Sequence, residues 1–483
     1  MGVSGSDTAL LRVDAGGMRD AAPEHFDAVV LGGGTGGMHL AWHLADSGRR
    51  VAVVERRWIG GSCPTINCLP SKNEIWSAKI ADLVRYAATF GAGGDYVQVD
   101  MGKVRQRKRD MVDHMVAGIS KQYHNSGAEL VMGRGRFVAP RTISIRLNDG
   151  GRRVLRGEHV YVNVGTRAAI PEVPGLRAAR PMTSVEMLEL DYVPPHLIVL
   201  GGGYVGLELA QAYRRFGSRV TIVQHGPHVV RDEDADVAEE VRRMLVDEGI
   251  DVLENAAPVA VGGRSGDEVT VAVETSNGRR DIDGTDILVA AGRVPNTARI
   301  GLDVAGVQLD KQGYVLVNER LETTAPDVWG IGECCSQQPQ FTHVSLDDFR
   351  ILRDNLDGGS RSTGDRLVPQ CMFTDPELAR VGLTETHAAD RGIPVRIARL
   401  DAAAVPHAQT TGETRGFMKA LVAEDDDRIL GFTMFGAQAG EVTAAVQVAM
   451  LAGLPYTSLR DAVLTHPTMA EGLGALFSNV PQR

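Results

Sequence analysis

Residues 27–55 read DAVVLGGGTGGMHLAWHLADSGRRVAVVE, and this stretch predicts how the fold begins. A short apolar strand over Asp27–Leu31 leads into a glycine-rich turn, and a helical stretch over Met38–Ser47 follows. A second strand, Arg50–Val54, closes with Glu55. This order of strand, turn, helix and strand is the setting in which G-x-G-x-x-G binds a dinucleotide.

Each glycine of this fingerprint has a physical task. Gly32 allows the tight turn, Gly34 lets the backbone approach a pyrophosphate, and Gly37 lets helix and strand pack closely. The helix N-terminus adds amide donors and the positive end of its dipole. Glu55, 23 residues after Gly32, is placed to accept hydrogen bonds from an adenosine ribose.

The same unit recurs about 170 residues later. A strand over His196–Leu200 leads into a second fingerprint, a helix over Val205–Phe216 and a strand over Arg219–Val223. The glycines of the second fingerprint are Gly201, Gly203 and Gly206. Two fingerprints predict two dinucleotides, and a flavin with a nicotinamide is the economical pair because a hydride donor needs an acceptor.

Gln224 stands where the first unit has Glu55. A carboxylate there favours NAD and repels a 2′-phosphate, whereas Gln224, His225, His228 and Arg231 offer donors. We therefore expect NADPH as the nicotinamide cofactor, with NADH as the alternative.

A close pair of cysteines follows the first unit, in GGSCPTINCLPSK at residues 60–72. Four residues separate Cys63 from Cys68, so a small disulfide loop can close if the segment coils into a helix. A helix N-terminus lowers the pKa of a thiol and makes it a better nucleophile. The alternatives are a fragment of a zinc site, which needs two further ligands that are not evident, or two unrelated buried thiols.

Composition restricts the class of protein. With 483 residues the chain is too long for one core, and its five cysteines are too few for a secreted disulfide scaffold. The net charge of −10 argues against nucleic acid as a partner. No run has the length of a membrane span or of a signal-peptide core, which favours a cytoplasmic protein without a membrane partner.

Taken together, the ordered motifs resemble those of the FAD-dependent pyridine nucleotide–disulfide oxidoreductases, over about residues 25–480. The segment FTHVSLDDFR at 341–350 is most similar to the mercuric reductase-like branch. The markers are the two fingerprints, the cysteine block ending in Pro70-Ser71-Lys72, AGRVPN at 291–296, GIGE at 330–333, and His466-Pro467-Thr468 with Glu471.

This resemblance implies a redox centre. Cys63 would attack the substrate and Cys68 would lie against the flavin, with Lys72 near flavin N5 and Glu208 as its ion-pair partner. Tyr204 matches an aromatic gate over the nicotinamide pocket. Cys334 and Cys335 are expected to be packing residues.

Further cofactor contacts are implied by the same resemblance. Glu333 stands where the family has an aspartate that binds the flavin ribityl chain. Ser345 and Asp348 are expected to cap a helix aimed at the flavin pyrimidine. The other residues predicted to bind cofactor are Gly61, Ser62, Gly165, Thr342, Gly292 and Arg293.

His466 and Glu471 match the family's acid–base dyad, which comes from the other subunit, so we expect a homodimer with a shared active site. No metal site is predicted. The expected fold is α/β, with two Rossmann-type dinucleotide-binding domains plus an α+β C-terminal dimerisation domain. The expected segments are a flexible lead-in at 1–24, an FAD domain at 25–165 and 298–365, an NAD(P)H domain at 166–297, and an interface domain at 366–483.

The predicted activity is NADPH-dependent reduction, or reversible formation, of a small disulfide through Cys63 and Cys68. Glutathione is disfavoured because Trp42 and His43 stand where glutathione reductases carry arginine. Hg(II) is disfavoured because the final residues SNVPQR hold no cysteine pair. The alternative is a metal-ion or quinone reductase of the mercuric reductase-like branch.

Overall fold

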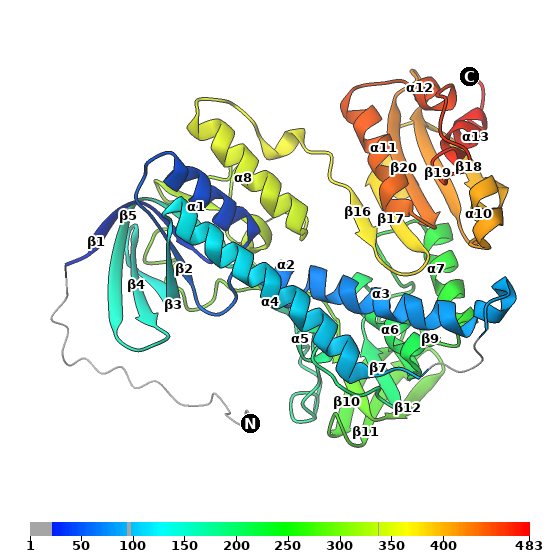
Figure 1. The fold of residues 1–483 in the computed structure, drawn as a ribbon, viewed down its shortest axis with the longest axis horizontal. Coiled ribbons are helices and arrows are strands. Elements are labelled where there is room, and N and C mark those ends of the chain that lie inside the picture. The colour runs from blue at the N-terminus through cyan, green and yellow to red at the C-terminus, as the bar shows by residue number, and fades with distance from the viewer. Residues whose placement is uncertain (1–21, 94–97, 337) are drawn as a thin grey trace.

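A computed structural model describes residues 22–93, 98–336 and 338–483, whose strands form five sheets (Figure 1). The first sheet is built around β1, which pairs in parallel with β2 on one side and β5 on the other. β2 pairs in parallel with β3, β15 pairs in parallel with β5, and β4 lies antiparallel between β3 and β5. The strands are β1 (Glu24–Leu31), β2 (Val51–Glu55), β3 (Glu129–Ala139), β4 (Thr142–Leu147), β5 (Arg152–Val162) and β15 (Val328–Gly330).

The lead-in predicted at 1–24 needs correction at its end. Residues 1–21 lie outside the described part of the chain, but Glu24 already belongs to β1. Its carboxylate accepts hydrogen bonds of 2.8 and 2.7 Å from the guanidinium of Arg153 on β5. The strand therefore begins three residues earlier than the apolar pattern indicates, because an ion pair extends it beyond the buried residues.

Helices cover the first sheet and carry the cysteine block. α1 packs against α8 and α4, and the short α2 precedes the long α3 (Figure 1). α1 begins at Thr35 rather than at Met38, because Gly36 and Gly37 are themselves helical and buried. The helices are α1 (Thr35–Asp46), α2 (Ser62–Thr65), α3 (Cys68–Arg85), α4 (Met101–Ser126) and α8 (Thr342–Leu356).

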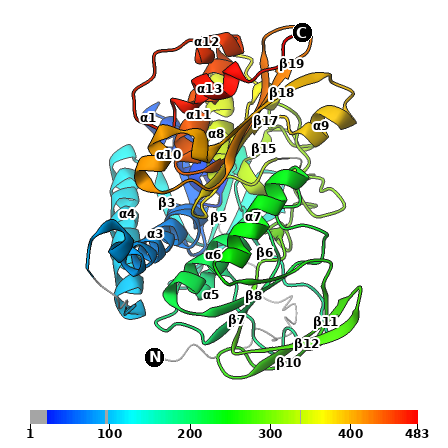
Figure 2. The ribbon, with the colours of Figure 1, turned by 90° about the vertical axis from the view of Figure 1, so that its right-hand side faces the viewer.

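The second parallel sheet has the order β13-β7-β8-β9 and carries α6 and α7. A separate antiparallel sheet, β10-β11-β12, lies at the lower edge of the molecule in Figure 2. The strands of both sheets are β7 (His196–Leu200), β8 (Arg219–Val223), β9 (Asp251–Leu253), β10 (Ala257–Gly263), β11 (Val269–Thr275), β12 (Gly278–Gly284) and β13 (Asp286–Val289). The helices are α5 (Ser184–Met187), α6 (Tyr204–Phe216) and α7 (Ala235–Asp247).

The chain enters and leaves this second unit through one narrow connection. β6 (Thr166–Ala168) pairs antiparallel with β14 (Arg293–Pro295), so the two crossings lie side by side. The predicted boundaries after residues 165 and 297 lie at the same end of this pair, because Thr166 is opposite Pro295.

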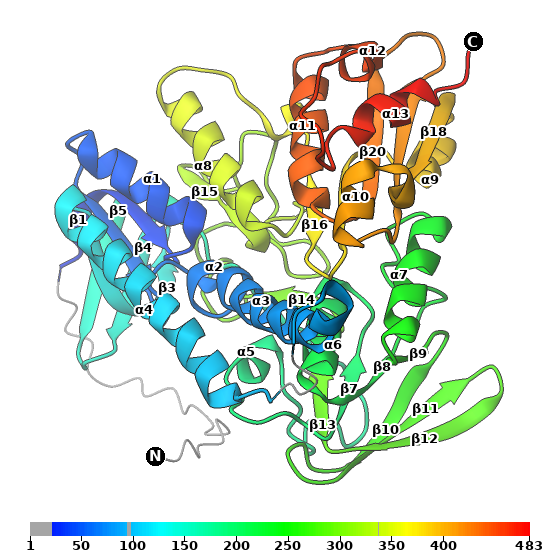
Figure 3. The ribbon, with the colours of Figure 1, turned by 45° about the vertical axis from the view of Figure 1, so that its right-hand side comes forward.

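The C-terminal part is an antiparallel sheet of five strands in the order β16-β17-β20-β19-β18, with helices against it (Figure 3). Its strands are β16 (Gln370–Met372), β17 (Glu377–Gly382), β18 (Val395–Asp401), β19 (Phe417–Ala423) and β20 (Ile429–Gly436). Its helices are α9 (Glu385–Asp390), α10 (Pro406–Thr411), α11 (Ala439–Leu451), α12 (Tyr456–Arg460) and α13 (Gly472–Ser478). In the described ranges, no helix is both long and apolar enough to cross a bilayer.

Candidate active site

The first fingerprint forms a cradle whose backbone leaves no room for side chains. Gly32 has φ of +106°, and a Cβ there would lie 2.3 Å from the carbonyl oxygen of Asn163. Gly61, the residue before α2, has φ of +78°, and a Cβ there would lie 2.6 Å from Cα of Gly34. The backbones of Gly61 and Gly34 thus meet at the N-terminus of α1, where a pyrophosphate fits.

Glu55 is fixed at the edge of this cradle. Its Oε2 atom accepts a hydrogen bond of 2.8 Å from the amide of Gly33. Its Oε1 atom accepts hydrogen bonds from the amides of Arg57 and Trp58, at 2.8 and 3.0 Å. The carboxylate is therefore oriented before any nucleotide arrives, and this hydrogen-bond acceptor and the glycine cradle fit the adenosine half of FAD.

The second fingerprint repeats this relation with an amide in place of the acid. Oε1 of Gln224 accepts a hydrogen bond of 2.9 Å from the amide of Gly202. Gly203 is the N-cap of α6, and nothing lies within 4 Å of a Cβ built on it. Both His225 and Arg231 are exposed, and Arg231 is 3.3 Å from Asp232. The structure therefore leaves the predicted donors open to solvent beside a turn that matches the first one, which fits a second dinucleotide.

Both cysteines of the pair, Cys63 and Cys68, are free thiols beside the first cradle. Cys63 lies in α2, next to Ser62, and Cys68 is the first residue of α3. The hydrogen bond from the Cys63 thiol, the Thr342 hydroxyl 3.3 Å away and the charge of Lys72 lower the pKa of Cys68 to about 6, against the effect of burial. The same hydrogen bond, together with burial, raises the pKa of Cys63. In the dithiol state the thiolate therefore resides on Cys68 and the proton on Cys63.

Lys72 and Glu208 form the ion pair implied by the resemblance. Nζ of Lys72 on α3 lies 2.7 Å from Oε2 of Glu208 on α6. The other carboxylate oxygen of Glu208 accepts a hydrogen bond of 2.8 Å from the amide of Phe373, and Lys72 lies over the Phe373 ring at 4.7 Å. Residues from all three parts of the chain therefore meet next to Cys68.

Glu333 makes an ion pair within the protein. Its carboxylate accepts hydrogen bonds from the hydroxyl of Thr166 and, at 3.0 Å, from the guanidinium of Arg293. Arg293 also donates to the Thr166 hydroxyl at 2.7 Å. Two other predicted contacts, Gly165 and Gly292, adjoin the β6–β14 connection, with nothing within 4 Å of a Cβ built on either. The Glu333 side chain, longer than the aspartate expected from the family, thus reaches the crossing strands β6 and β14.

The capping prediction for Ser345 and Asp348 is wrong. α8 begins at Thr342, one turn earlier, and its N-cap is Phe341. Ser345 lies within the helix, where its hydroxyl accepts a hydrogen bond of 3.2 Å from the amide of Gly36. Asp348 accepts one of 2.6 Å from the amide of Gly332, and burial raises the pKa of Asp348 to about 6. Ser345 therefore bonds to the first cradle at Gly36, and Asp348 bonds to Gly332. Thr342, at the start of α8, faces Cys68.

His466 and Glu471 pair with each other on the C-terminal domain. Nδ1 of His466 lies 2.8 Å from Oε2 of Glu471, and the His466 side chain is 69% exposed. α13, which follows this dyad, lies well apart from α2 in Figures 1 and 3. Within one chain, the dyad and the cysteine pair are not brought together.

Some residues of the site were not predicted from the sequence. Asn163 accepts a hydrogen bond of 3.1 Å from the amide of Gly37 and donates one of 2.9 Å to the carbonyl of Ile331. It is a buried polar residue that follows an apolar strand, and that contrast was a usable signal. Glu233, which accepts a hydrogen bond of 2.9 Å from the Tyr204 hydroxyl, gave no signal because the contact is made only in the folded chain.

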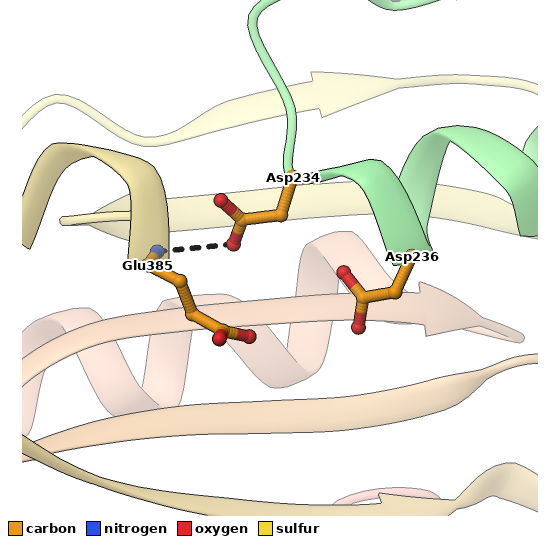
Figure 4. A group of neighbouring side chains, drawn as sticks. All are labelled: Asp234, Asp236 and Glu385. Carbon is orange, nitrogen blue, oxygen red and sulfur yellow. Dashed lines mark hydrogen bonds between the residues drawn. The ribbon is translucent and has the colours of Figure 1, made fainter. Parts of the chain in front are cut away.

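In the described part of the chain, three carboxylates lie close enough together to hold a metal ion. They belong to Asp234 and Asp236 at the start of α7 and to Glu385 on α9 (Figure 4). Nζ of the buried Lys419 lies 3.0, 2.8 and 2.7 Å from these three carboxylates. The cluster is therefore a partly buried ion network that joins α7 to the C-terminal sheet through a lysine ammonium.

Two family models match this chain. The model described as pyridine nucleotide-disulphide oxidoreductase matches residues 26–348, and the dimerisation domain of the same family matches residues 368–476. The family and the fold class predicted from the sequence are confirmed.

Individual relatives agree with these matches. The probable pyridine nucleotide-disulfide oxidoreductase RclA of Escherichia coli K12 is 34% identical over 464 residues, 94% of this chain and 99% of RclA. A mercuric reductase of Acidithiobacillus ferrooxidans is 34% identical over 449 residues, 92% of this chain and 80% of that enzyme. The solved Cu(II) complex of the HOCl-induced flavoprotein disulfide reductase RclA superposes with a TM-score of 0.85 at 32% identity, covering 94% of this chain and 99% of that one. The chain therefore belongs to the pyridine nucleotide-disulphide oxidoreductases, a family of FAD-dependent enzymes that use a pyridine nucleotide as reductant.

Proposed function

We propose that this enzyme uses NADPH and FAD to reduce a small disulfide other than glutathione disulfide, through Cys63 and Cys68. The observation that carries the proposal is the position of Cys68. It begins α3 beside the first cradle, 3.3 Å from the Thr342 hydroxyl, with a pKa lowered to about 6. A stabilised thiolate at that position suits electron exchange with a flavin.

FAD, when bound, supplies the acceptor for a hydride from the reduced nicotinamide and passes the electron pair to the cysteine disulfide. Residues of the first unit would hold it: Gly32, Gly34, Gly37, Glu55, Gly61, Ser62 and Glu333. The ammonium of Lys72, oriented by Glu208 at 2.7 Å, would stabilise negative charge that develops next to it.

The chemistry at sulfur then follows from the two thiols. The Cys63 thiolate attacks one sulfur of the substrate disulfide, the S–S bond breaks, and the leaving thiolate takes a proton. The Cys68 thiolate next attacks the Cys63 sulfur of the mixed disulfide, which restores the Cys63–Cys68 disulfide and releases the second substrate sulfur as a thiolate, and this thiolate takes the second proton from the solvent. The substrate gains two electrons and two protons, and the dithiol is oxidised.

Cys63 needs a base, because its pKa is raised and it holds the proton of the pair. We propose His466 of the partner subunit as that base, oriented by its own Glu471. The His466 side chain is exposed, and α13, which follows the dyad, lies apart from α2 within one chain, so a homodimer would complete the site. Apolar side chains on the solvent side of α3 offer a surface on which a partner subunit could pack: Trp76, Ile80 and Leu83 are 54, 44 and 48% exposed.

The preference for NADPH rests on Gln224. Its side chain takes the position of Glu55 and carries no charge to repel a 2′-phosphate, and the exposed His225 and Arg231 lie in the loop that follows. Substituting Gln224→Glu keeps the hydrogen bond to Gly202 and adds a negative charge. The ratio of kcat/KM for NADPH to that for NADH is expected to fall about tenfold or more, because an unpaired like charge is costly at a phosphate site. An unchanged ratio would refute the assignment to NADPH.

The second candidate is reduction of a metal ion or a quinone. It is favoured by relatives that are named mercuric reductases and by an RclA structure solved as a Cu(II) complex. The variant Cys63→Ser separates the candidates when the purified enzyme is assayed with a panel of small disulfides, Hg(II), Cu(II) and quinones. Loss of disulfide turnover with quinone turnover kept supports the dithiol mechanism. Metal-ion turnover without disulfide turnover in the unmodified enzyme would favour the alternative.

A further inference from the structure

The turn that carries Glu333 is packed against the first cradle. Gly332 begins the short helical turn η2 (Gly332–Cys334) with φ of +72°, and a Cβ built on it would lie 2.8 Å from Oγ of Ser345. The same hydroxyl accepts the hydrogen bond from the amide of Gly36 in the first turn of α1. The η2 turn, α8 and the start of α1 are therefore in contact, so the position of Glu333 depends on what holds this turn.

Asp348 holds the η2 turn through its backbone. Oδ2 of Asp348 accepts a hydrogen bond of 2.6 Å from the amide of Gly332, and the Asp348 side chain is fully buried. Ser345 and Asp348 lie three residues apart, so they project from the same face of α8, one toward α1 and the other toward η2. A buried amide that loses its acceptor is costly, so the conformation of η2 depends on the carboxylate of Asp348.

The charge of Asp348 is balanced by an arginine that lies outside α8. The guanidinium of Arg366 bonds to Oδ1 of Asp348 and lies 2.9 Å from Oδ2 of Asp347. The Arg366 side chain is 7% exposed, and it donates a further hydrogen bond of 2.7 Å to Gln338. Arg366 belongs to the connection between α8 and β16, which leads into the C-terminal domain. Because a buried carboxylate without a cation is unstable, Arg366 keeps Asp348 charged and in place.

Resting on the proposed placement of FAD at the first cradle and Glu333, we propose that Asp348, paired with Arg366, is a positioning residue of the FAD site. Because Asp348 is fully buried, it acts through the Gly332 amide and the turn that presents Glu333, and not by contact with a ligand. Arg366 acts one step further away, through Asp348. The same link joins the connection to the C-terminal domain to the flavin site, so the loss of Arg366 should weaken the retention of FAD.

The test is the rate at which FAD leaves the purified holoenzyme, followed as the rise of flavin fluorescence after dilution at pH 8. At this pH Asp348, whose pKa is about 6, is ionised. Asp348→Asn keeps the shape of the side chain but removes its charge, and Arg366→Met removes the cation that balances it. We expect FAD to leave each variant about tenfold faster, since tenfold is about the effect of one hydrogen bond to a charged group.

Further variants provide the controls. Asp347→Asn removes the neighbouring carboxylate, which pairs with the same arginine and with Arg361, and should leave the rate within about twofold because Gly332 keeps its acceptor. Arg366→Lys keeps a positive charge and should restore most of the retention of FAD. Combining Asp348→Asn with Arg366→Met should speed release no further than either change alone, because both act through the same contact.

A general loss of structure is separated from this effect by a readout outside the site. The dissociation constant of NADP⁺ should stay within about twofold in every variant, because Gln224 and the second fingerprint lie in the other nucleotide-binding unit. Unchanged release of FAD from both Asp348→Asn and Arg366→Met would overturn the proposal, as would equal acceleration in Asp347→Asn or an equal weakening of NADP⁺ binding. Unmodified protein that retains no FAD would instead overturn the proposed function.

Discussion

Nζ of Lys72 lies 2.7 Å from Oε2 of Glu208, and this pair joins the helix that begins at Cys68 to the first helix of the second nucleotide-binding unit. The Glu208 side chain is 6% exposed; its charge is balanced by this lysine, and its other oxygen accepts a hydrogen bond from the amide of Phe373. The pair therefore sets both the electrostatics beside Cys68 and the contact between the two units.

We predict that Lys72→Met slows the reduction of FAD by NADPH about ten- to hundredfold, because a charge that stabilises the reacting centre is lost. Stopped-flow absorbance at the flavin wavelength measures this rate, and the flavin content of the variant shows that folding is kept. Lys79→Met is the matched control: it lies on the same helix but pairs with Asp375 and Glu413. Equal rates in both variants would contradict a specific role for Lys72.

Cys68 is predicted to titrate near pH 6. Its folded pKa is depressed, so the thiolate is present above about pH 6 and is lost as the pH falls through that value. The long-wavelength band of a thiolate lying against oxidised flavin should therefore be full at pH 8 and half lost near pH 6 in the two-electron-reduced enzyme. A midpoint near pH 8 to 9, the range of an ordinary thiol, would disprove the depressed pKa.

Thr342 is predicted to contribute to that depressed pKa. Its hydroxyl lies 3.3 Å from Sγ of Cys68 and stabilises the thiolate. Thr342→Val should move the midpoint of the band upward by up to about one pH unit, since one unit corresponds to about the strength of a single hydrogen bond. Thr342→Ser keeps the hydroxyl and should restore the midpoint; if both variants titrate like the unmodified enzyme, the contact has no such effect.

The dyad of His466 and Glu471 is predicted to act on the cysteines of the other subunit. His466→Gln should slow disulfide turnover about a hundredfold or more and leave flavin reduction by NADPH unchanged, because a general base acts only on the thiol half of the cycle. The half-buried His407, in the same domain, provides the control variant His407→Gln.

Mixed dimers make that prediction sharper. A heterodimer of a Cys63→Ser chain and a His466→Gln chain contains one complete site if the dyad acts across the interface, and none if it acts within a chain. Activity that appears on mixing the two inactive variants would support the shared site. Absence of activity, with heterodimers verified by mass spectrometry, would contradict it.

The features that could be predicted from the sequence are those that depend on residues close together along the chain. The two fingerprints work in this way: Gly33 with Glu55 and Gly202 with Gln224 make the same amide-to-side-chain hydrogen bond at the same spacing. The cysteine pair at the start of a helix is likewise local, since Cys68 begins α3.

What could not be predicted depends on contacts between distant segments. The capping pattern at Ser345 and Asp348 was misleading because these side chains accept hydrogen bonds from the amides of Gly36 and Gly332 and do not cap the helix. The partner of Tyr204, Glu233, lies in a loop that is anchored by Arg380 of the C-terminal domain. Asp234 and Asp236 meet Lys419 only in the folded chain, and no local pattern around any of them indicates that network.

The measurement that tests the central claim most directly is an anaerobic titration of the purified, FAD-loaded enzyme with NADPH, followed in the visible spectrum at pH 8. The account predicts a long-wavelength band after two electrons, from the Cys68 thiolate against oxidised flavin, which is absent in Cys68→Ser. Direct bleaching to reduced flavin with no such band would contradict the account, because the cysteine pair would then take no part in electron transfer.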